Sequence, residues 1–263
     1  MGAIARRLCE AKTVTNEDEL EILEDLDIAF GDPLEQLDVA QLPPPPDPEE
    51  MLALLTHPEP AERMRGARAF SEITDARATP LLMQLLQETC PLMRVSAAYG
   101  LGRNPSLEAV DALIEQYYQD FNGHVRKGIV WALGNCRDRR SVGPLVQAMT
   151  TDIPAVRLWA ASSLAQLSNL EYDDIIVALP PLIGALRQDA IAAIRSNCAW
   201  SIGQLCRELP ANVVYATAID ALIESLVEDE DLGVTEDARA ALLDLGDPRG
   251  LQMIEELEQE GLV

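Results

Sequence analysis

The side chains that most often do chemistry are few in this chain of 263 residues, and they are spread along it. The two histidines, His57 and His124, stand far apart, and neither is followed by Glu. A first-row metal generally needs several imidazole or carboxylate ligands that converge on one point, so we expect no metal site. The sequence contains no glycine-rich phosphate loop, Gly-x-Ser-x-Gly or Ser-His-Asp set, and no carboxylate pair stands out as an acid and base. No catalytic residue is predicted.

The five cysteines are odd in number, and no two form a Cys-x-x-Cys pair. Such usage is typical of a reduced chain, and because no stretch resembles a signal peptide or a membrane span we expect a cytoplasmic protein without membrane insertion. Their places in the repeats described below predict that Cys136 and Cys198 are buried and that Cys206 lies at the edge of the packed face. The sequence leaves open whether Cys9, Cys90 or Cys206 is a reactive thiol, although an inert cysteine is the simpler interpretation for each.

Aromatic residues are more informative, because three of them recur at one position of a repeated pattern. Tyr99, Trp131 and Trp200 each stand five residues after an arginine. Exposed Trp and Tyr often anchor protein interfaces, where truncating one can cost about 2 kcal/mol or more. We therefore predict a concave binding face that includes these rings, with the alternative that curvature folds them against the next repeat. Residues one or nine positions after these arginines, or after Arg157, complete the predicted face: Val95, Arg103, Lys127, Asn135, Leu158, Gln166 and Gln204. Trp159 is expected to pack between repeats.

The arginines that set this register belong to a repeat. Its copies begin at Arg63, Arg94, Arg126, Arg157, Arg195 and, in a degraded form, Thr235, with steps of 31, 32, 31, 38 and 40 residues. Positions three and six residues later are mostly small, and the position seven later is large and apolar, which marks a helix packed tightly on one side. Since one arginine recurs in each repeat, we expect a structural ladder to neighbouring carboxylates or carbonyls.

Each repeat reads as a first helix, a short turn and a second helix that the arginine motif opens. First helices are predicted over 48–56, 77–88, 107–120, 141–151, 174–188 and 212–228. Second helices are predicted over 60–73, 91–103, 124–136, 154–168, 190–208 and 233–245. A last acidic helix over 248–260 would cap the open end of the stack. The expected fold of residues 47–263 is all-α, an α-solenoid (superhelix) of about six helix pairs.

Residues 1–46 have a different character. Ten acidic side chains lie between Glu17 and Asp38, and the stretch ends in four consecutive prolines. We expect an acidic leader that is largely extended or disordered, in which residues 17–30 can form a short amphipathic helix. It is either a solvated tail or a tethered motif that docks on a partner or on the array. The apolar residues of this motif would be Leu20, Leu23, Leu26 and Phe30.

The charge of the whole chain restricts its partners. With 44 acidic and 20 basic side chains, the formal net charge is −24. Such a chain is repelled by phosphate backbones and by anionic membrane surfaces. Nucleic acid is therefore not expected as a partner.

The repeat motif resembles a known family. Ala155-Val156-Arg157 with Ala160 and Leu164, and Val125-Arg126 with Ala132, Leu133 and Gly134, follow a Pro-x-Val-Arg-x-x-Ala-x-x-Ala-Leu-Gly pattern. Helix pairs of about 31 residues with this pattern resemble the HEAT-like repeats of the phycobilisome lyase type, over residues 47–247. Such repeats serve bilin attachment, phycobilisome turnover, electron-carrier maturation and hydroxylation. The order of acidic leader, proline hinge and array is most similar to cyanobacterial HEAT-repeat regulators of iron–sulfur assembly.

Three functions remain open from the sequence. The first is a non-catalytic scaffold or regulator that holds an unidentified protein partner on the concave face and needs no cofactor. The alternative that the resemblance implies is a bilin lyase or bilin chaperone of the phycobilisome lyase E/F type, in which Tyr99, Trp131 and Trp200 flank the tetrapyrrole and Arg103 or Lys127 supplies a cation. The third is a structural spacer. Self-association is left open.

Overall fold

The computed structural model describes residues 46–167 and 170–261, which contain thirteen α-helices and no strand. The chain divides into two units, Met1–Pro45 and Pro46–Val263. The predicted leader helix over 17–30 and its apolar residues lie outside the described residues. The second unit is the repeat array, and everything below concerns this unit.

The array consists of six helix pairs and one last helix. The first helices of the pairs are α3 (Pro48–Leu54), α5 (Thr79–Leu85), α7 (Val110–Gln119), α9 (Val142–Thr151), α11 (Tyr172–Gln188) and α13 (Val213–Glu228). The second helices are α4 (Pro60–Ala69), α6 (Pro91–Arg103), α8 (Gly123–Cys136), α10 (Pro154–Gln166), α12 (Ala192–Cys206) and α14 (Leu232–Leu245). The last helix is α15 (Pro248–Glu260), and the short 3-10 helices η2 (Ala76–Ala78) and η3 (Arg139–Ser141) precede α5 and α9. The all-α repeat prediction is confirmed.

The residues at the helix starts either lack the first backbone N–H group or provide a hydrogen-bond acceptor for it. Pro60, Pro91 and Pro154 open second helices at positions whose amide has no partner within the helix. The side chain of Asn122 caps α8 by accepting from the amides of His124 and Val125. Helix α4 ends at Ala69, four residues before the predicted end, because the chain turns at Phe70 and continues into η2.

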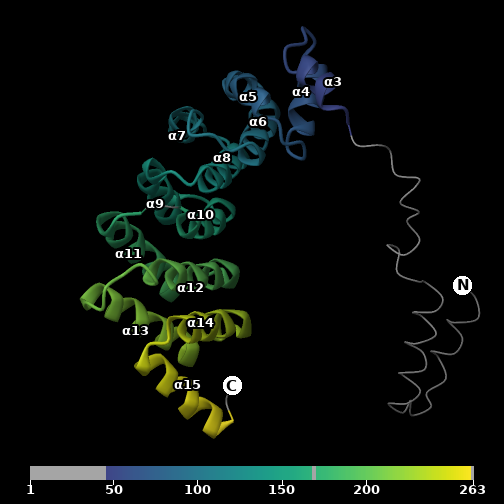
Figure 1. The fold of residues 1–263 in the computed structure, drawn as a ribbon. Helices are drawn as coiled ribbons and strands as arrows, with labels where there is room; N and C mark the ends of the chain where they lie inside the picture. Colours follow the sequence, from purple (N-terminus) through teal and green to yellow (C-terminus); the bar gives the residue numbers. More distant parts are fainter. Residues whose placement is uncertain (1–45, 168–169, 262–263) are drawn as a thin grey trace, which may run out of the picture. The chain divides into compact units, whose positions relative to one another are not determined.

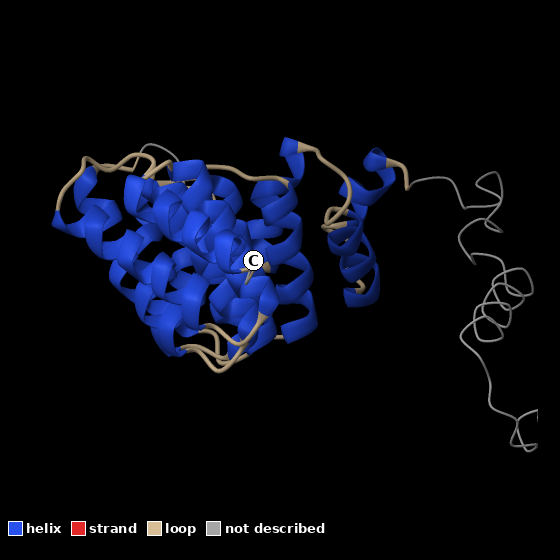
Figure 2. Ribbon diagram, turned by 90° about the horizontal axis from the view of Figure 1, so that it is seen from below, coloured by secondary structure: helices blue, strands red, loops and turns tan. Residues whose placement is uncertain are grey.

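The two kinds of helix form two rows. Figure 1 shows α6, α8, α10, α12 and α14 stacked side by side on the inside of the curve that this unit makes, with α5, α7, α9, α11 and α13 on its outer side. Seen from below in Figure 2, the turns gather at two opposite edges of the stack. Each second helix therefore contacts the second helices before and after it, as well as its own first helix.

The core lies between the rows, and the repeat register explains it. The position seven residues after each motif arginine, or after Thr235, is fully buried in every repeat: Phe70, Leu101, Leu133, Leu164, Ile202 and Leu242. The position three residues after is buried too, and it is small in five of the six copies. Small side chains there let neighbouring second helices approach closely. At the end of the stack α15 buries Ile254 and Leu257 and exposes its glutamates, as expected of a cap.

Candidate functional site

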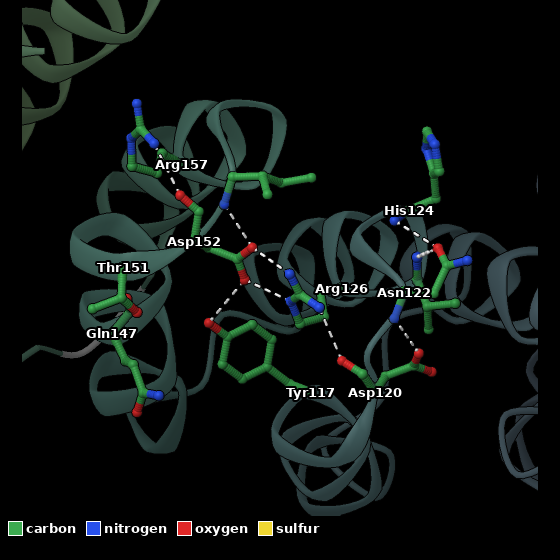
Figure 3. Close-up of polar contacts among 11 residues, drawn as sticks. Tyr117, Asp120, Asn122, His124, Arg126, Gln147, Thr151, Asp152 and Arg157 are labelled. Carbon is green, nitrogen blue, oxygen red and sulfur yellow. Dashed lines mark hydrogen bonds and ion pairs between the residues drawn. The ribbon is translucent and has the colours of Figure 1, made fainter.

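The motif arginines form a continuous ladder along the edge where each first helix turns into its second helix. In Figure 3, Arg126 reaches the carboxylate of Asp152 through Nε and Nη2, at 2.7 and 2.6 Å, and the main-chain carbonyl of Asp120 through Nη1, at 2.9 Å. The carboxylate of Asp120 in turn accepts from Arg94 of the preceding repeat. Each aspartate thus binds one arginine through its side chain and the next through its carbonyl.

The same geometry recurs in the later repeats. Arg157 binds the carboxylate of Asp189 and the carbonyl of Asp152, while Arg195 binds the carboxylate of Asp229 and the carbonyl of Asp189. The planar guanidinium matches a carboxylate with two parallel hydrogen bonds. At the first repeat, Arg63 pairs with Glu88 and with the carbonyls of its own turn. These bonds join consecutive repeats, and no arginine of the ladder is singled out as a catalytic group.

The ladder also fixes the ionisation of its aspartates. Burial alone would raise the pKa of Asp152, but the hydrogen bonds from Arg126 and the amide of Ile153 outweigh it, so this pKa lies below its usual range. The pKa values of Asp120, Asp189 and Asp229 are lowered in the same way. The hydroxyl of Tyr117 donates to Asp152 at 3.3 Å, and burial raises the pKa of this tyrosine. All four aspartates are therefore held as carboxylates at neutral pH.

Three aromatic rings meet on the second helices, and we call them the ring cluster: Tyr99 on α6, Trp131 on α8 and Trp159 on α10. The ring centroids of Tyr99 and Trp131 lie 5.5 Å apart, and those of Trp131 and Trp159 lie 6.5 Å apart in an edge-to-face arrangement. The ammonium group of Lys127 lies 5.8 Å from the centroid of Trp159. All three rings are half-buried, so each keeps a surface that a ligand can reach.

The position of the Trp131 ring depends on a glycine of the preceding repeat. A Cβ on Gly102 would lie 2.4 Å from two ring atoms of Trp131, so the indole occupies the space that a side chain would fill. The amide of Asn135 donates to the carbonyl of the same Gly102 at 2.9 Å, which ties α8 to α6 beside the ring. The two contacts hold the indole flat against the neighbouring helix.

The other predicted face residues lie at or near this surface, with differing exposure. Arg103 is exposed and donates to the carbonyl of Glu72. Val95 and Leu158 are half-buried and pack against the core, and the carbonyl of Leu158 accepts from Asn197. Gln166 and Gln204 are half-buried at the far ends of α10 and α12. The predicted face is therefore a mixed surface in which several side chains also serve the packing of repeats.

The other two tryptophans have different surroundings. Trp200 is 40% exposed, and no ring contact to the ring cluster is present among the described residues, so it stands alone on α12. Trp159 packs between repeats, as expected, and through this contact it also joins the ring cluster. The physical reason is angular: positions two and five of the register lie about 60° apart around a helix, so Trp159 of one repeat meets Trp131 of its neighbour.

Carboxylates are absent from four consecutive second helices, although the chain has 44 of them. Residues 91–103, 123–136, 154–166 and 192–206 contain no Asp or Glu. Of the six basic side chains on these helices, four are ladder arginines whose charges the turn aspartates balance. Arg103 and Lys127 remain beside the ring cluster. The inner face is thus locally cationic in an acidic protein, and it suits an anionic ligand.

A shallow groove opens next to the cluster. Its volume is about 390 Å³, and its lining residues are Gly102, Arg103, Pro105, Trp131, Asn135 and Arg137. No carboxylate lines it. The groove combines one aromatic surface with two guanidinium groups, which together could hold a planar molecule that carries acid groups.

The histidines and cysteines have mainly structural surroundings. His57 accepts from the amide of Glu59 in its turn, and among the described residues no group of three or more His, Cys, Asp and Glu is placed to hold a metal ion. Cys136 and Cys198 are buried, as predicted. Cys206 was expected at the edge of the packed face, but it is 1% exposed, because α12 is packed between α11 and α14. Burial raises the pKa of the Cys206 thiol to about 12. The fourth cysteine of the array, Cys90, is exposed.

Sequence reasoning missed a second set of ion pairs on the opposite edge of the stack. An aspartate there caps a turn and binds the arginine two residues later, which also reaches an acidic residue of the preceding first helix. The three copies are Asp75 with Arg77 and Glu49, Asp138 with Arg140 and Asp111, and Asp247 with Arg249 and Asp220. The recurring Asp-x-Arg spacing is the signal that could have revealed them.

None of the helices among the described residues is long and apolar enough to cross a bilayer.

Known proteins share the repeat sequence of this chain. The family model of HEAT repeats matches residues 48–122 and 110–203. The bilin biosynthesis protein RpcF of Synechococcus sp. (strain WH8020) is 32% identical, in an alignment that covers 46% of this chain and 68% of that protein.

Solved structures show the same architecture. The complex of CpcE and CpcF of phycocyanin lyase from Nostoc sp. PCC7120 aligns with a TM-score of 0.51 and 26% identity, over 64% of this chain and 99% of the other. A designed armadillo repeat protein in complex with a (KR)4 peptide aligns with a TM-score of 0.57 and 20% identity, over 75% and 98%, which is a likeness of fold alone. The chain belongs to the HEAT-repeat proteins and, within them, to the phycobilisome lyase type.

Proposed function

We propose that this chain is a bilin-handling subunit that holds a linear tetrapyrrole on the ring cluster. One observation carries the proposal: the half-buried rings of Tyr99, Trp131 and Trp159 lie on three successive second helices, α6, α8 and α10, that contain no carboxylate, beside Arg103 and Lys127. A tetrapyrrole is a planar conjugated molecule with propionate groups. Its pyrrole rings would lie against the indole of Trp131, and its propionates would pair with the two cations.

The chemistry that this face can supply is binding and orientation. Its four helices offer no carboxyl group that could donate or accept a proton, and the arginines other than Arg103 are committed to the ladder. We therefore propose that groups for proton transfer come from a partner subunit or from the acceptor protein. The similarity to a two-subunit phycocyanin lyase supports a protein partner.

Titration of the full chain with biliverdin tests the proposal. Binding should red-shift the pigment absorbance and quench tryptophan fluorescence. Trp131→Ala should weaken binding at least tenfold, because it removes the middle ring of the cluster. Trp200→Ala is the matched control, since Trp200 has the same register position but lies outside the ring cluster; it should change affinity less than twofold. Absence of any spectral change, or equal losses in both variants, would overturn the proposal.

A protein-binding regulator without pigment is the second candidate, which one observation favours. The carboxylate-free face continues beyond the ring cluster to Trp200 and Gln204 of α12, farther than one groove. An extended acidic peptide could follow this length. The family comparison favours bilin handling over the iron–sulfur assembly that the order of segments suggested. Capture of a protein partner by the wild type but not by Trp200→Ala, with no response to biliverdin, would support the regulator.

A further inference from the structure

A row of exposed apolar side chains runs along the ladder edge, apart from the ring cluster. One large apolar residue lies within two positions of the N-cap of each second helix from α6 to α14, and together we call them the apolar edge: Leu92, Phe121, Ile153, Ile191 and Leu232. Their exposed fractions are 61%, 100%, 46%, 43% and 82%. Single exposed apolar residues are ordinary on protein surfaces, but here one recurs per repeat at one place.

The stacking of the repeats makes these residues neighbours in space. The second helices lie side by side and point the same way, so their starts share one edge (Figures 1 and 2). The Ile153 side chain reaches back to the preceding repeat, because a Cβ on Gly123 would lie 2.5 Å from its Cδ1. Phe121 stands two residues before that glycine. Ile153 of one repeat thus approaches the start of the preceding second helix, next to Phe121 in the chain.

The surroundings of the apolar edge are acidic. The turns that join each first helix to its second helix are residues 55–59, 86–90, 120–122, 152–153, 189–191 and 229–231, and they contain no Lys or Arg. They hold eight carboxylates, five of which the ladder arginines balance. Glu59, Glu230 and Asp231 are left without an arginine of the ladder and are exposed. A partner with basic groups beside an apolar stripe complements this edge.

The repeat distance points to a helix as the partner. Packed helices lie about 8–10 Å apart, and an α-helix rises about 10.5 Å in seven residues. A helix laid along the edge would thus bring one side chain to each repeat if its apolar residues recur every seven positions. We infer that the apolar edge docks a basic amphipathic helix of another protein, with apolar residues at heptad spacing. A second copy of this chain does not fit, because it would bring two acidic edges together.

Fluorescence anisotropy with a synthetic peptide tests this inference, which does not depend on the pigment. The probe is a labelled 35-residue helix with Leu at every seventh position and Lys on the flanks. Phe121→Ser combined with Ile153→Ser should raise the dissociation constant at least tenfold. The matched control, Leu107→Ser with Val213→Ser, removes two residues of similar exposure at the starts of first helices and should change it less than twofold. Circular dichroism verifies that each variant keeps its helical content.

Three further binding measurements complete this experiment. A peptide of the same composition with the leucines redistributed should bind at least tenfold more weakly than the heptad peptide, and so should a peptide with Glu in place of Lys. Trp131→Ala should leave peptide binding unchanged, so that a failure here differs from a failure of the pigment proposal. Equal binding of the redistributed peptide, no binding at all, or self-association that the double Ser variant abolishes would overturn the inference.

Discussion

Arg126 and Asp152 form the central link of the ladder, with two parallel hydrogen bonds of 2.7 and 2.6 Å between one guanidinium and one carboxylate. The side chains are 19% and 5% exposed, so the pair is largely shielded from water. Because the carbonyl of Asp152 also accepts from Arg157, one residue fixes the register of two successive repeats. The link thus connects the ends of the second helices that carry the ring cluster.

Asp152→Ala should destabilise the array strongly, because it leaves Arg126 without its carboxylate and Tyr117 without its acceptor. For a largely buried pair we expect a loss of about 2–3 kcal/mol in the free energy of unfolding, measured by urea denaturation. Asp111→Ala is the control, since it breaks an exposed ion pair with Arg140 and should change little. Equal effects of the two substitutions would show that the ladder does not hold the repeats together.

The acid sensitivity of this link follows from the lowered pKa of Asp152. A carboxylate whose folded pKa lies below its unfolded value of about 3.9 contributes stability above that value, and the contribution is lost as the pH falls through the folded pKa. The stability difference between the wild type and Asp152→Asn should therefore be constant from pH 7 to about 5 and shrink below about pH 4. Thermal unfolding at each pH measures it. A difference that grew on acidification would contradict the assignment.

The fold could be predicted from the sequence because one constraint repeats. The motif occurs six times, with an arginine in five copies and Thr235 in the last, followed by small residues and a large apolar residue. These copies fix both the helices and the face that each buries, so errors were confined to helix ends such as Ala69. The ring cluster was harder to predict. Register places Trp131 on the inner face, but its contact with Gly102 and its meeting with Trp159 depend on how adjacent helices approach, which a single repeat does not encode.

The charge pattern of the inner face could have been read from the sequence but was hidden by the overall charge. A net value of −24 suggests an acidic surface everywhere, whereas α6, α8, α10 and α12 carry no carboxylate. Only the helix bounds reveal this segregation. The apolar edge was also hard to predict from the sequence. Its residues precede or begin the second helices, so they fall outside the register positions that are counted from the arginines.

Gly102→Ala should displace the Trp131 ring, because the new methyl group would lie 2.4 Å from two of its atoms. We expect a red shift of tryptophan fluorescence, weaker biliverdin binding and a loss of about 1–2 kcal/mol in stability. Gly184→Ala in α11 is the control, since a Cβ there meets nothing within 4 Å and should instead stabilise the helix by about 0.5–1 kcal/mol. Unchanged fluorescence of Gly102→Ala would mean that the ring does not rest on this glycine.

The four cysteine thiols of the array should react at different rates, one rapidly and three slowly. In a Cys9→Ser variant, the thiols that remain are those of Cys90, Cys136, Cys198 and Cys206. Cys90 is exposed at the start of α6, whereas the other three are buried with raised pKa values, which for Cys206 is about 12. Because the thiolate is the reactive form, the raised pKa would slow the reaction of Cys206 even if reagent reached it.

A disulfide reagent monitored by absorbance should thus release one equivalent rapidly from the folded Cys9→Ser variant and three more only on unfolding. Adding Cys90→Ser should remove the rapid phase completely. If two or more thiols reacted rapidly in the folded variant, the close packing of α12 against α11 and α14 would be wrong, because Cys198 and Cys206 report on that region. The slow phase should follow the global unfolding rate in urea, since these thiols are exposed only when neighbouring repeats separate.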